Sequence, residues 1–271
     1  MENIEHLANR AVIRISGDER HDFLQGLITQ DIARLTPENA IFTTLLTPQG
    51  KILFDFCVVD MGDAYLIDCD RETAPALARR LTLYKLRAKV TIEIDDTLKV
   101  IASSKDLSGH DGGGFADPRL PALGWRAITS DAASDGGDDY DRRRIALGVP
   151  EFGKDFSSDE IFLLDVNYDA LNGVSYKKGC FVGQEVTSRM KRKGEARRRT
   201  LVAEFDGPAP ARGASITAGA STLGEILSGV DGQALALVRL DRWKKSQEAG
   251  DAPECDRRPL RLSIPAYLEP V

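Results

Sequence analysis

Three apolar runs that alternate with two turn sequences constrain the fold of this chain more than any other feature of its sequence. The runs cover residues 40–47, 51–59 and 64–69. Pro48-Gln49-Gly50 and Met61-Gly62-Asp63 separate them, and both sequences are typical of tight turns. Runs of this length joined by such short turns are expected to pair as antiparallel strands. Residues 40–69 are therefore predicted to form a three-stranded meander.

Helical patterns stand on both sides of this meander. Ser16 and Glu19 have the S-x-x-E spacing of a capping box, and apolar residues recur at helical spacing just after them. A second helix is predicted to begin near Glu72, and residues 89–94 return to a strand pattern. Antiparallel strands with helices packed on one side indicate the α+β class.

The sequence changes to an all-β pattern after Arg199. Short apolar runs separated by Gly, Pro and Asp follow one another at residues 200–205, 215–218, 223–228 and 234–240. Many short strands of this kind are typical of a small barrel. We therefore expect residues 1–195 to form an α+β region, either single or divided into two interleaved subdomains. Residues 196–271 are expected to form a C-terminal β-barrel.

Composition and charge place the chain among soluble globular proteins. Hydrophobic residues make up 42% and charged residues 29% of its 271 residues. No apolar run approaches the ~18 residues of a membrane span. The net charge of −6 argues against a protein that wraps nucleic acid with its whole surface. The start, Met-Glu-Asn-Ile-Glu-His-Leu, is acidic and has no apolar segment, so neither a secretory signal nor a transit peptide is expected.

The cysteines favour a reducing compartment. Cys57, Cys69, Cys180 and Cys255 are far apart in the sequence and include no C-x-x-C pair. This spacing fits neither a disulfide framework nor a zinc site, and the three histidines show no ligand spacing either. We therefore expect a cytoplasmic protein with free thiols, no resident metal and no membrane contact.

Asp55 is the first candidate for a functional residue. It stands in the middle of the predicted strand over residues 51–59, in which both faces are largely apolar. A carboxylate buried in such a strand is costly unless it has a partner. One interpretation is a structural ion pair, for example with Arg87. The other is a ligand pocket in which Asp55 accepts hydrogen bonds from an aminopyrimidine ring.

A second candidate site is the block Lys178-Gly179-Cys180-Phe181-Val182-Gly183-Gln184-Glu185. Its glycines permit a tight turn or a close approach to a ligand, and a helix is predicted to begin at Gln184. The free N–H groups of that helix, together with Lys177 and Lys178, would stabilise a thiolate at Cys180. Two interpretations stay open, namely a reactive or ligand-facing thiol and a buried, inert cysteine. The scarcity of histidines argues against a Cys–His hydrolase.

Basic residues are concentrated between Arg189 and Arg199. Such a run is usually a solvated surface. Alternatively it binds phosphate, the glutamate tail of a folate, or RNA. No aromatic residues are interleaved with it, so residues 189–199 support no more than a weak RNA contact.

The block from Lys178 to Glu185 resembles the K-G-C-[FY]-x-G-Q-E signature of YgfZ-type proteins, whose eukaryotic relatives act in mitochondrial iron–sulfur assembly. Further stretches are similar to the same family, and together they span nearly the whole chain: residues 23–31, 46–51, 117–119, 123–126 and 148–151. The wider superfamily is that of the glycine-cleavage T-protein, a tetrahydrofolate-dependent aminomethyltransferase.

The resemblance implies a T-protein-like fold of antiparallel sheets with helices arranged around a central channel. That channel would hold tetrahydrofolate or a related reduced folate. Asp55 occupies the place of the aspartate that acts on the folate in the T-protein. Asp165 and Asn167, which precede the cysteine block, and Gln184 are the other expected folate contacts.

The leading functional hypothesis from this resemblance is a folate-binding accessory factor for assembly or repair of iron–sulfur enzymes. Cys180 would be its working thiol with Lys178 beside it, and its partners would be iron–sulfur enzymes or assembly proteins. The T-protein lacks the cysteine block, so an accessory factor is favoured over an enzyme. Two alternatives stay open. One is a folate-dependent aminomethyltransferase-like one-carbon transferase, which Asp55 would permit; the other is a tRNA-modification factor that binds RNA.

Overall fold

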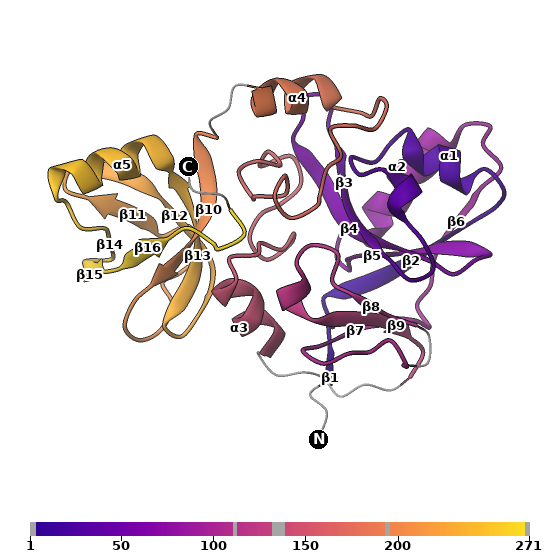
Figure 1. Ribbon diagram of the computed structural model, residues 1–271, viewed down its shortest axis with the longest axis horizontal. Coiled ribbons are helices and arrows are strands. Elements are labelled where there is room, and N and C mark those ends of the chain that lie inside the picture. The colour runs from indigo at the N-terminus through magenta and orange to yellow at the C-terminus, as the bar shows by residue number, and fades with distance from the viewer. Residues whose placement is uncertain (1–3, 111–112, 132–138, 193–195, 269–271) are drawn as a thin grey trace. The chain divides into compact units, whose positions relative to one another are not determined.

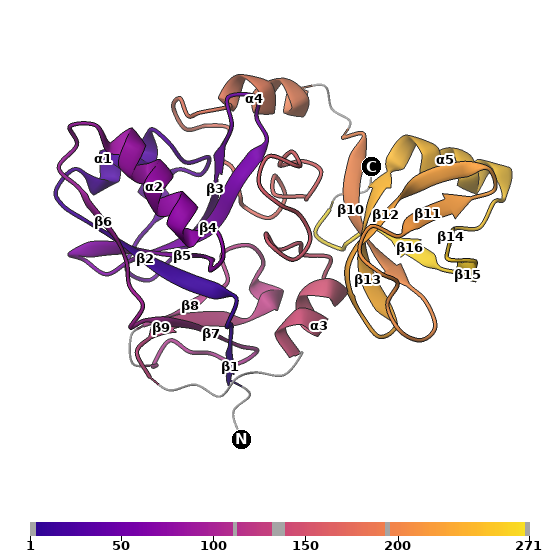
Figure 2. The ribbon, with the colours of Figure 1, turned by 180° about the vertical axis from the view of Figure 1, so that it is seen from behind.

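The computed structural model describes residues 4–110, 113–131, 139–192 and 196–268, and the chain divides into two compact units. The first unit comprises Met1–Tyr140 and Asn172–Gln184, and the second comprises Asp141–Leu171 and Glu185–Val271. Figure 1 and Figure 2 show the elements of both units from opposite sides. The predicted domain boundary between residues 195 and 196 adjoins residues 193–195, which lie outside the described part of the chain, and it stays a prediction.

A five-stranded antiparallel sheet forms one layer of the first unit. Its strand order is β3 (Ile41–Leu46), β4 (Ile52–Asp60), β5 (Ala64–Asp70), β2 (Arg10–Ser16) and β6 (Thr91–Ile94). The first three strands in this order are the predicted meander, and the two predicted turns join them. Every residue of β3 and β5 is buried, because both faces of the sheet are covered.

A four-stranded antiparallel sheet forms the second layer. Its strand order is β1 (Ile4–His6), β7 (Lys99–Ser103), β9 (Trp125–Thr129) and β8 (Gly114–Ala116). Val12, Val59 and Leu66 of the larger sheet share one buried apolar cluster with Val100 and Ile128 of the smaller one. The two sheets therefore pack face to face around a common core.

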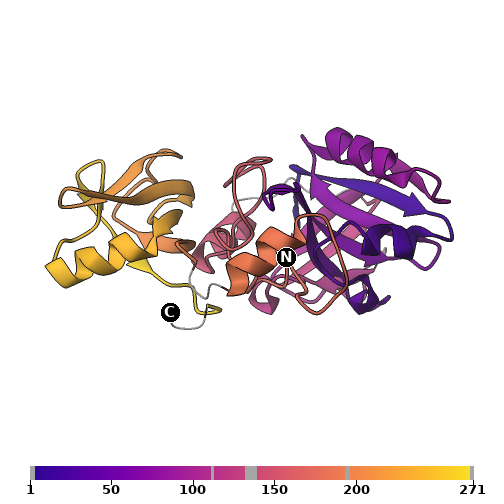
Figure 3. The same cartoon turned by 90° about the horizontal axis from the view of Figure 1, so that it is seen from above.

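Helices cover the outer parts of the first unit: α1 (Arg20–Gln25), the 3-10 helix η1 (Ile32–Arg34), α2 (Ala74–Lys85) and the 3-10 helix η2 (Pro121–Leu123). Helix α2 buries Leu77 and Leu81 and packs against β2 and β6. In Figure 3 it lies along one face of the larger sheet. The predicted α+β class, with antiparallel strands and helices, is confirmed.

The predicted capping box at Ser16 and Glu19 was wrong. Ser16 is the last residue of β2 and pairs with Ala64 and Thr91 in the sheet, so its backbone is held away from the helix end. Glu19 is the N-cap residue of α1 without a side-chain hydrogen bond to the helix. Its carboxylate accepts the backbone N–H of Lys89 at 3.0 Å instead.

A group of buried charges connects the two sheets of the first unit. The carboxylate of Asp68 on β5 accepts hydrogen bonds from Arg10 at 2.6 Å and from Arg126 on β9 at 2.5 Å. Asp117 accepts from Arg126 at 2.9 Å and from Arg119 at 2.6 Å. All five side chains are almost completely buried. Each carboxylate therefore has two guanidinium partners, which offsets the cost of removing these charges from water.

The second unit contains a seven-stranded antiparallel sheet that closes almost into a barrel. Its strand order is β15 (Arg258–Pro259), β14 (Glu254–Cys255), β11 (Ser215–Ala218), β12 (Ser221–Val230), β13 (Gln233–Arg239), β10 (Arg198–Glu204) and β16 (Arg261–Ser263). The first and last strands in this order are joined by Leu260 alone, so the two ends of the sheet meet. Leu201, Ile216 and Ile226 are among the residues of its closed apolar core. The predicted C-terminal barrel is confirmed.

The remaining helices are α3 (Asp139–Ala146), α4 (Gln184–Arg192) and α5 (Leu240–Ala249). Arg144 on α3 donates to Asp155 at 2.7 Å and to Ser228 Oγ at 2.8 Å, and Asp155 also accepts the backbone N–H of Ser228 at 2.9 Å. These bonds fix Asp155, which lies in the turn-rich residues 147–171, onto strand β12. Within the described ranges, the helices are too short or too polar to cross a membrane.

Candidate functional site

Asp55 lies near the middle of β4 with a side chain that is 3% exposed. It pairs across the sheet with Thr44 of β3. Arg87, the residue suggested by the sequence as a structural partner, lies exposed after the end of α2. The structure thus places a buried carboxylate in a covered strand, as predicted, and it does so beside a cluster of buried hydroxyl groups.

That cluster consists of three threonines that are completely buried. Thr29 Oγ1 lies 3.2 Å from the hydroxyl of Thr43 and 3.0 Å from that of Thr44. Thr29 also donates to the carbonyl oxygen of Gly173 at 2.6 Å. The segment around Thr29 therefore connects the strand that faces Asp55 to the chain that leads into the cysteine block.

Lys178 holds the same segment from the other side. Its ammonium donates to the carbonyl oxygens of Gln25 at 2.7 Å, Ile28 at 2.6 Å and Gln30 at 3.0 Å. Burial lowers the pKa of Lys178 to about 8. Because an ammonium has three N–H donors, these carbonyls use all of them and leave none for the thiol of Cys180. The predicted action of Lys178 on that thiol stays a prediction, and the contacts seen are those of a positioning residue.

The turn that carries Cys180 is fixed by Gly183. Gly183 has φ +81, and a Cβ atom built there would lie 2.7 Å from the carbonyl oxygen of Thr47. The cysteine block thus packs against the turn between β3 and β4, where only glycine fits. Helix α4 begins at Gln184 as predicted, and the Gln184 side chain donates to the carbonyl oxygen of Gly179 at 3.4 Å.

The four cysteines, all within the described part of the chain, differ in exposure. Cys180 is exposed, whereas Cys57, Cys69 and Cys255 are buried. Burial raises the pKa of Cys57 and of Cys69 to about 12 and also raises the pKa of Cys255. The three buried thiols therefore stay protonated and shielded from reagents near neutral pH. Because Cys180 is exposed, the interpretation of this residue as a buried, inert cysteine is wrong.

Asp165 and Asn167 belong to the second unit, whereas the other candidates belong to the first. Asp165 accepts a hydrogen bond from Arg198 at 2.7 Å, yet its burial raises its pKa. Asn167 has φ +61 and donates to the carbonyl oxygen of Thr200 at 2.7 Å and to Tyr267 Oη at 3.0 Å. Its Oδ1 is buried and has no hydrogen-bond partner among the described residues. The roles of both side chains in folate binding stay predictions.

The basic run from Arg189 to Arg199 is not a uniform solvated surface. Arg199 donates to Asp169 at 2.5 Å, and Lys191 lies 3.8 Å from the same carboxylate. Arg198 is paired with Asp165, as described above. Residues 193–195 of the run lie outside the described part of the chain. Part of its charge is therefore neutralised within the protein, and the weak RNA contact stays a prediction.

The charged residues between the two sheets were not singled out by the sequence analysis. Asp68 shows the same signal as Asp55, a carboxylate inside a strand that is buried along its whole length. Nothing in the sequence indicates that Arg10 and Arg126 would reach it, because all three are far apart along the chain. In the described ranges no three His, Cys, Asp or Glu side chains gather where they could hold a metal ion.

Comparison with known proteins identifies the class of protein that this fold defines. A crystal structure of the glycine cleavage system aminomethyltransferase T from Bartonella henselae matches with a TM-score of 0.71, over 98% of this chain and 86% of that chain, at 16% identity. Residues 197–270 match the family model of the CAF17 C-terminal beta-barrel domain. The chain therefore has the T-protein fold with a C-terminal barrel, as predicted.

The particular family follows from relatives of similar sequence. The human iron–sulfur cluster assembly factor IBA57 is 31% identical in an alignment that covers 88% of this chain and 78% of that protein. The IBA57 homologue of Neurospora crassa is 32% identical over 75% of this chain, which spans 54% of the homologue. The chain belongs to the IBA57 family of iron–sulfur cluster assembly factors.

Two expectations need correction in light of these relatives. The resemblance to YgfZ-type proteins holds for the superfamily, but the family shown by sequence identity is that of IBA57. The expected cytoplasmic location was wrong, because the relatives are named as mitochondrial proteins. The acidic start and the free thiols that suggested the cytoplasm do not distinguish the cytosol from other compartments in which thiols stay reduced.

Proposed function

We propose that this protein binds a reduced folate and supports assembly or repair of iron–sulfur enzymes, with Cys180 as its working thiol. The observation that carries the proposal is the exposure of Cys180 in a block that is held firmly on both sides. Lys178 is bonded to three carbonyl groups before it, and Gly183 packs against the turn between β3 and β4 after it.

An exposed thiol on a fixed turn suits contact with a partner protein or a cluster. The thiol does not need to be uncovered by a conformational change, since Cys180 is already at the surface. The other thiols are unsuited because they are buried and their pKa values are raised. Membership of the IBA57 family supports iron–sulfur assembly proteins and their client enzymes as the partners.

Folate binding is proposed from Asp55 and from the T-protein fold. A tetrahydrofolate molecule presents two adjacent N–H donors on its aminopyrimidine edge, and a buried carboxylate can accept both. Asp55 offers such a carboxylate on β4, beside the hydroxyl groups of Thr43 and Thr44. The folate would supply one-carbon chemistry if any takes place; the chain itself would bind and orient the ring.

A deletion strain tests the thiol. Cells that lack this protein would carry the parent gene, a Cys180→Ala copy or a Lys105→Ala copy, and several iron–sulfur enzymes would be assayed. We expect Cys180→Ala to abolish support of these enzymes and Lys105→Ala, a change at an exposed residue outside the candidate site, to leave it largely intact. If Cys180→Ala restores the enzymes as well as the parent does, the thiol has no working role.

Calorimetric titration with tetrahydrofolate tests the carboxylate. Asp55→Asn should weaken binding about tenfold to a hundredfold, the usual effect of losing a charge-assisted hydrogen bond. Asp60→Asn, the same change at the less buried end of β4, should leave the affinity unchanged. Equal affinities of parent and Asp55→Asn would exclude Asp55 as a folate contact. Methylene transfer to folate by the purified protein would favour the one-carbon transferase instead.

A further inference from the structure

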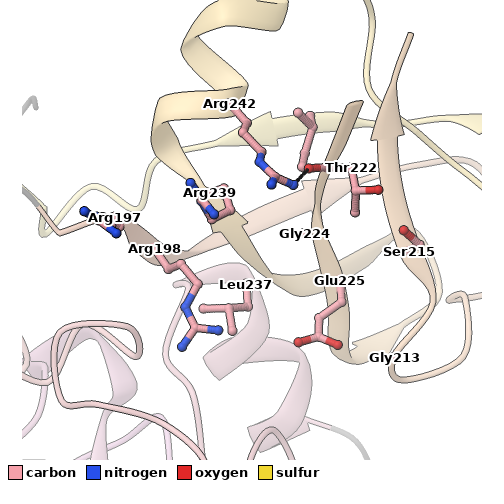
Figure 4. A pocket seen from close by; sticks show the side chains of 11 residues that line it. Arg197, Arg198, Gly213, Ser215, Thr222, Gly224, Glu225, Leu237, Arg239 and Arg242 are labelled. Atoms are coloured by element: carbon pink, nitrogen blue, oxygen red, sulfur yellow. Dashed lines mark hydrogen bonds between the residues drawn. The ribbon is translucent and has the colours of Figure 1, made fainter. Parts of the chain in front are cut away.

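A groove on the barrel of the second unit gathers arginines from two distant parts of the sequence. It has a volume of about 510 Å³, and Arg197 and Arg198 line it together with Arg239 and Arg242. Arg197 and Arg198 belong to the basic run at the start of β10, and the other two come from the junction of β13 and α5. Figure 4 shows these side chains on the outer face of the sheet.

Strand pairing explains why the groove forms there. Arg198 and Arg239 face each other across β10 and β13, and Glu225 pairs with Ser215 on one side and with Leu237 on the other. Side chains at these positions point away from the barrel core, since the alternate residues Ile216 and Ile226 are inside it. The outer face of four neighbouring strands thus carries the groove.

The arginines keep hydrogen-bond donors that the protein does not use. Arg242 donates from Nη1 to the carbonyl oxygen of Thr222 at 2.8 Å, which fixes its position and leaves Nη2 and Nε available. Arg197 is exposed, and its side chain has no ion pair or hydrogen bond within the described ranges. Arg198 and Arg239 are each paired with an aspartate and retain further N–H groups. Among the four arginines, Arg197 and Arg242 therefore have no carboxylate partner in the described ranges.

Glu225 places a carboxylate in the groove, opposite in charge to the arginines. It lines the groove and is exposed, and its carboxylate has no ion pair or hydrogen bond in the part of the chain that the structure describes. In Figure 4 the side chain of Leu237 lies between Arg198 and Glu225. The groove therefore presents an anion-binding side, an apolar floor and a carboxylate acceptor.

We infer that this groove binds a nucleotide, with its phosphates on Arg197 and Arg242 and its base toward Glu225. The volume is within the usual range for a ligand of that size. Arginine binds phosphate oxygens through its planar fork. A base lies flat on an apolar floor, and its N–H edge donates to a carboxylate. Guanine presents two adjacent N–H donors on one edge, so a guanine nucleotide matches a carboxylate better than the other bases do.

Titration calorimetry of the full chain at 0.15 M salt tests this inference. The probes are the four ribonucleoside triphosphates, sodium tripolyphosphate and a single-stranded RNA hexamer. We expect GTP to bind most tightly. Arg242→Gln should weaken GTP binding about tenfold to a hundredfold, while Lys244→Gln, an equal charge change on α5 at a residue that does not line the groove, should leave it unaltered. Glu225→Gln should weaken GTP binding without weakening that of tripolyphosphate.

Several results would overturn the inference. The first is that no nucleotide binds at millimolar concentration. The second is that tripolyphosphate binds as tightly as GTP, and the third is that Arg242→Gln binds GTP with the same affinity as the parent. Tighter binding of the RNA hexamer than of any nucleotide would show an RNA surface instead. The proposed folate contact Asp55 is in the first unit and is tested with Asp55→Asn, so failure of one proposal leaves the other standing.

Discussion

The ammonium group of Lys178 lies 2.6 Å from the carbonyl oxygen of Ile28, although the two residues are 150 positions apart. Two more carbonyl groups, from Gln25 and Gln30, complete the set of acceptors around it. The bond connects the cysteine block to the loop that carries Thr29, and through Thr29 to the strand opposite Asp55. The Lys178 side chain therefore helps to join the cysteine block to the part of the sequence that faces Asp55.

Lys178→Met should destabilise the first unit by about 2–4 kcal/mol. The change leaves three buried carbonyl groups without their donor, and relief of the buried charge only partly compensates. Hydrogen exchange at residues 25–30 would show the effect locally. In the parent the backbone N–H of Thr29 donates to the carbonyl oxygen of Thr44, and this N–H should exchange faster in the variant. Lys177→Met, next to it but exposed, should change little. Equal exchange rates in both variants would contradict the structural role of Lys178.

Gly183→Ala and Gly179→Ala form a matched pair within the cysteine block. At Gly183 an added Cβ would meet the carbonyl oxygen of Thr47 at 2.7 Å, and the positive φ is unfavourable for alanine. We expect a loss of about 1–3 kcal/mol in unfolding free energy, measured by urea denaturation. At Gly179 an added Cβ meets nothing within 4 Å, so that variant should stay within about 0.5 kcal/mol of the parent. A larger loss of unfolding free energy in Gly179→Ala than in Gly183→Ala would show that the turn is packed differently.

Alkylation should distinguish the cysteines. Iodoacetamide at neutral pH should modify Cys180 in the folded protein within minutes, because this thiol is exposed. Cys57 and Cys69 should react only after unfolding, since burial blocks access and raises the pKa of each to about 12. Mass spectrometry of peptides locates the label, and Cys180→Ser should abolish it in the folded state. Native labelling of Cys57 at a comparable rate would be incompatible with its position on β4.

Asp117→Asn should make the stability of the first unit less sensitive to acid. Burial alone would raise the pKa of Asp117, but Arg119 and Arg126 outweigh it and hold the pKa well below its usual range. The carboxylate therefore contributes stability above the unfolded-state pKa of about 3.9, and this contribution is lost as the pH falls toward the lower folded-state value.

Urea unfolding at pH 7, 5 and 3 measures this dependence. At pH 7 the variant should be less stable by about 3–5 kcal/mol, because two guanidinium groups lose a buried partner. Between pH 5 and 3 the parent should lose more stability than Asp117→Asn does. Asp63→Asn, in the exposed turn before β5, should follow the parent at every pH. Parallel curves for Asp117→Asn and the parent would show that Asp117 does not titrate as the structure indicates.

Much of the fold could be predicted because its signals are local. Strand β11 has the predicted bounds, the three strands of the meander agree within a residue or two, and helix α4 begins at the predicted residue. Turn residues and apolar runs act over a few positions, so the sequence records them directly. The capping box was wrong because a local spacing does not show which tertiary contacts compete with it. Ser16 and Glu19 have the correct spacing, but the sheet holds Ser16 in β2.

The sequence by itself determined the strand order of the meander, the barrel, the buried place of Asp55 and the glycine turn around Cys180. Only the tertiary structure decided which charges meet. It paired Asp68 with Arg10 and Arg126, turned Lys178 toward three carbonyl groups, and brought Arg197 to the same groove as Arg242. The physical reason is that an ion pair needs only proximity in space. No periodicity in the chain records which distant residue will supply the opposite charge.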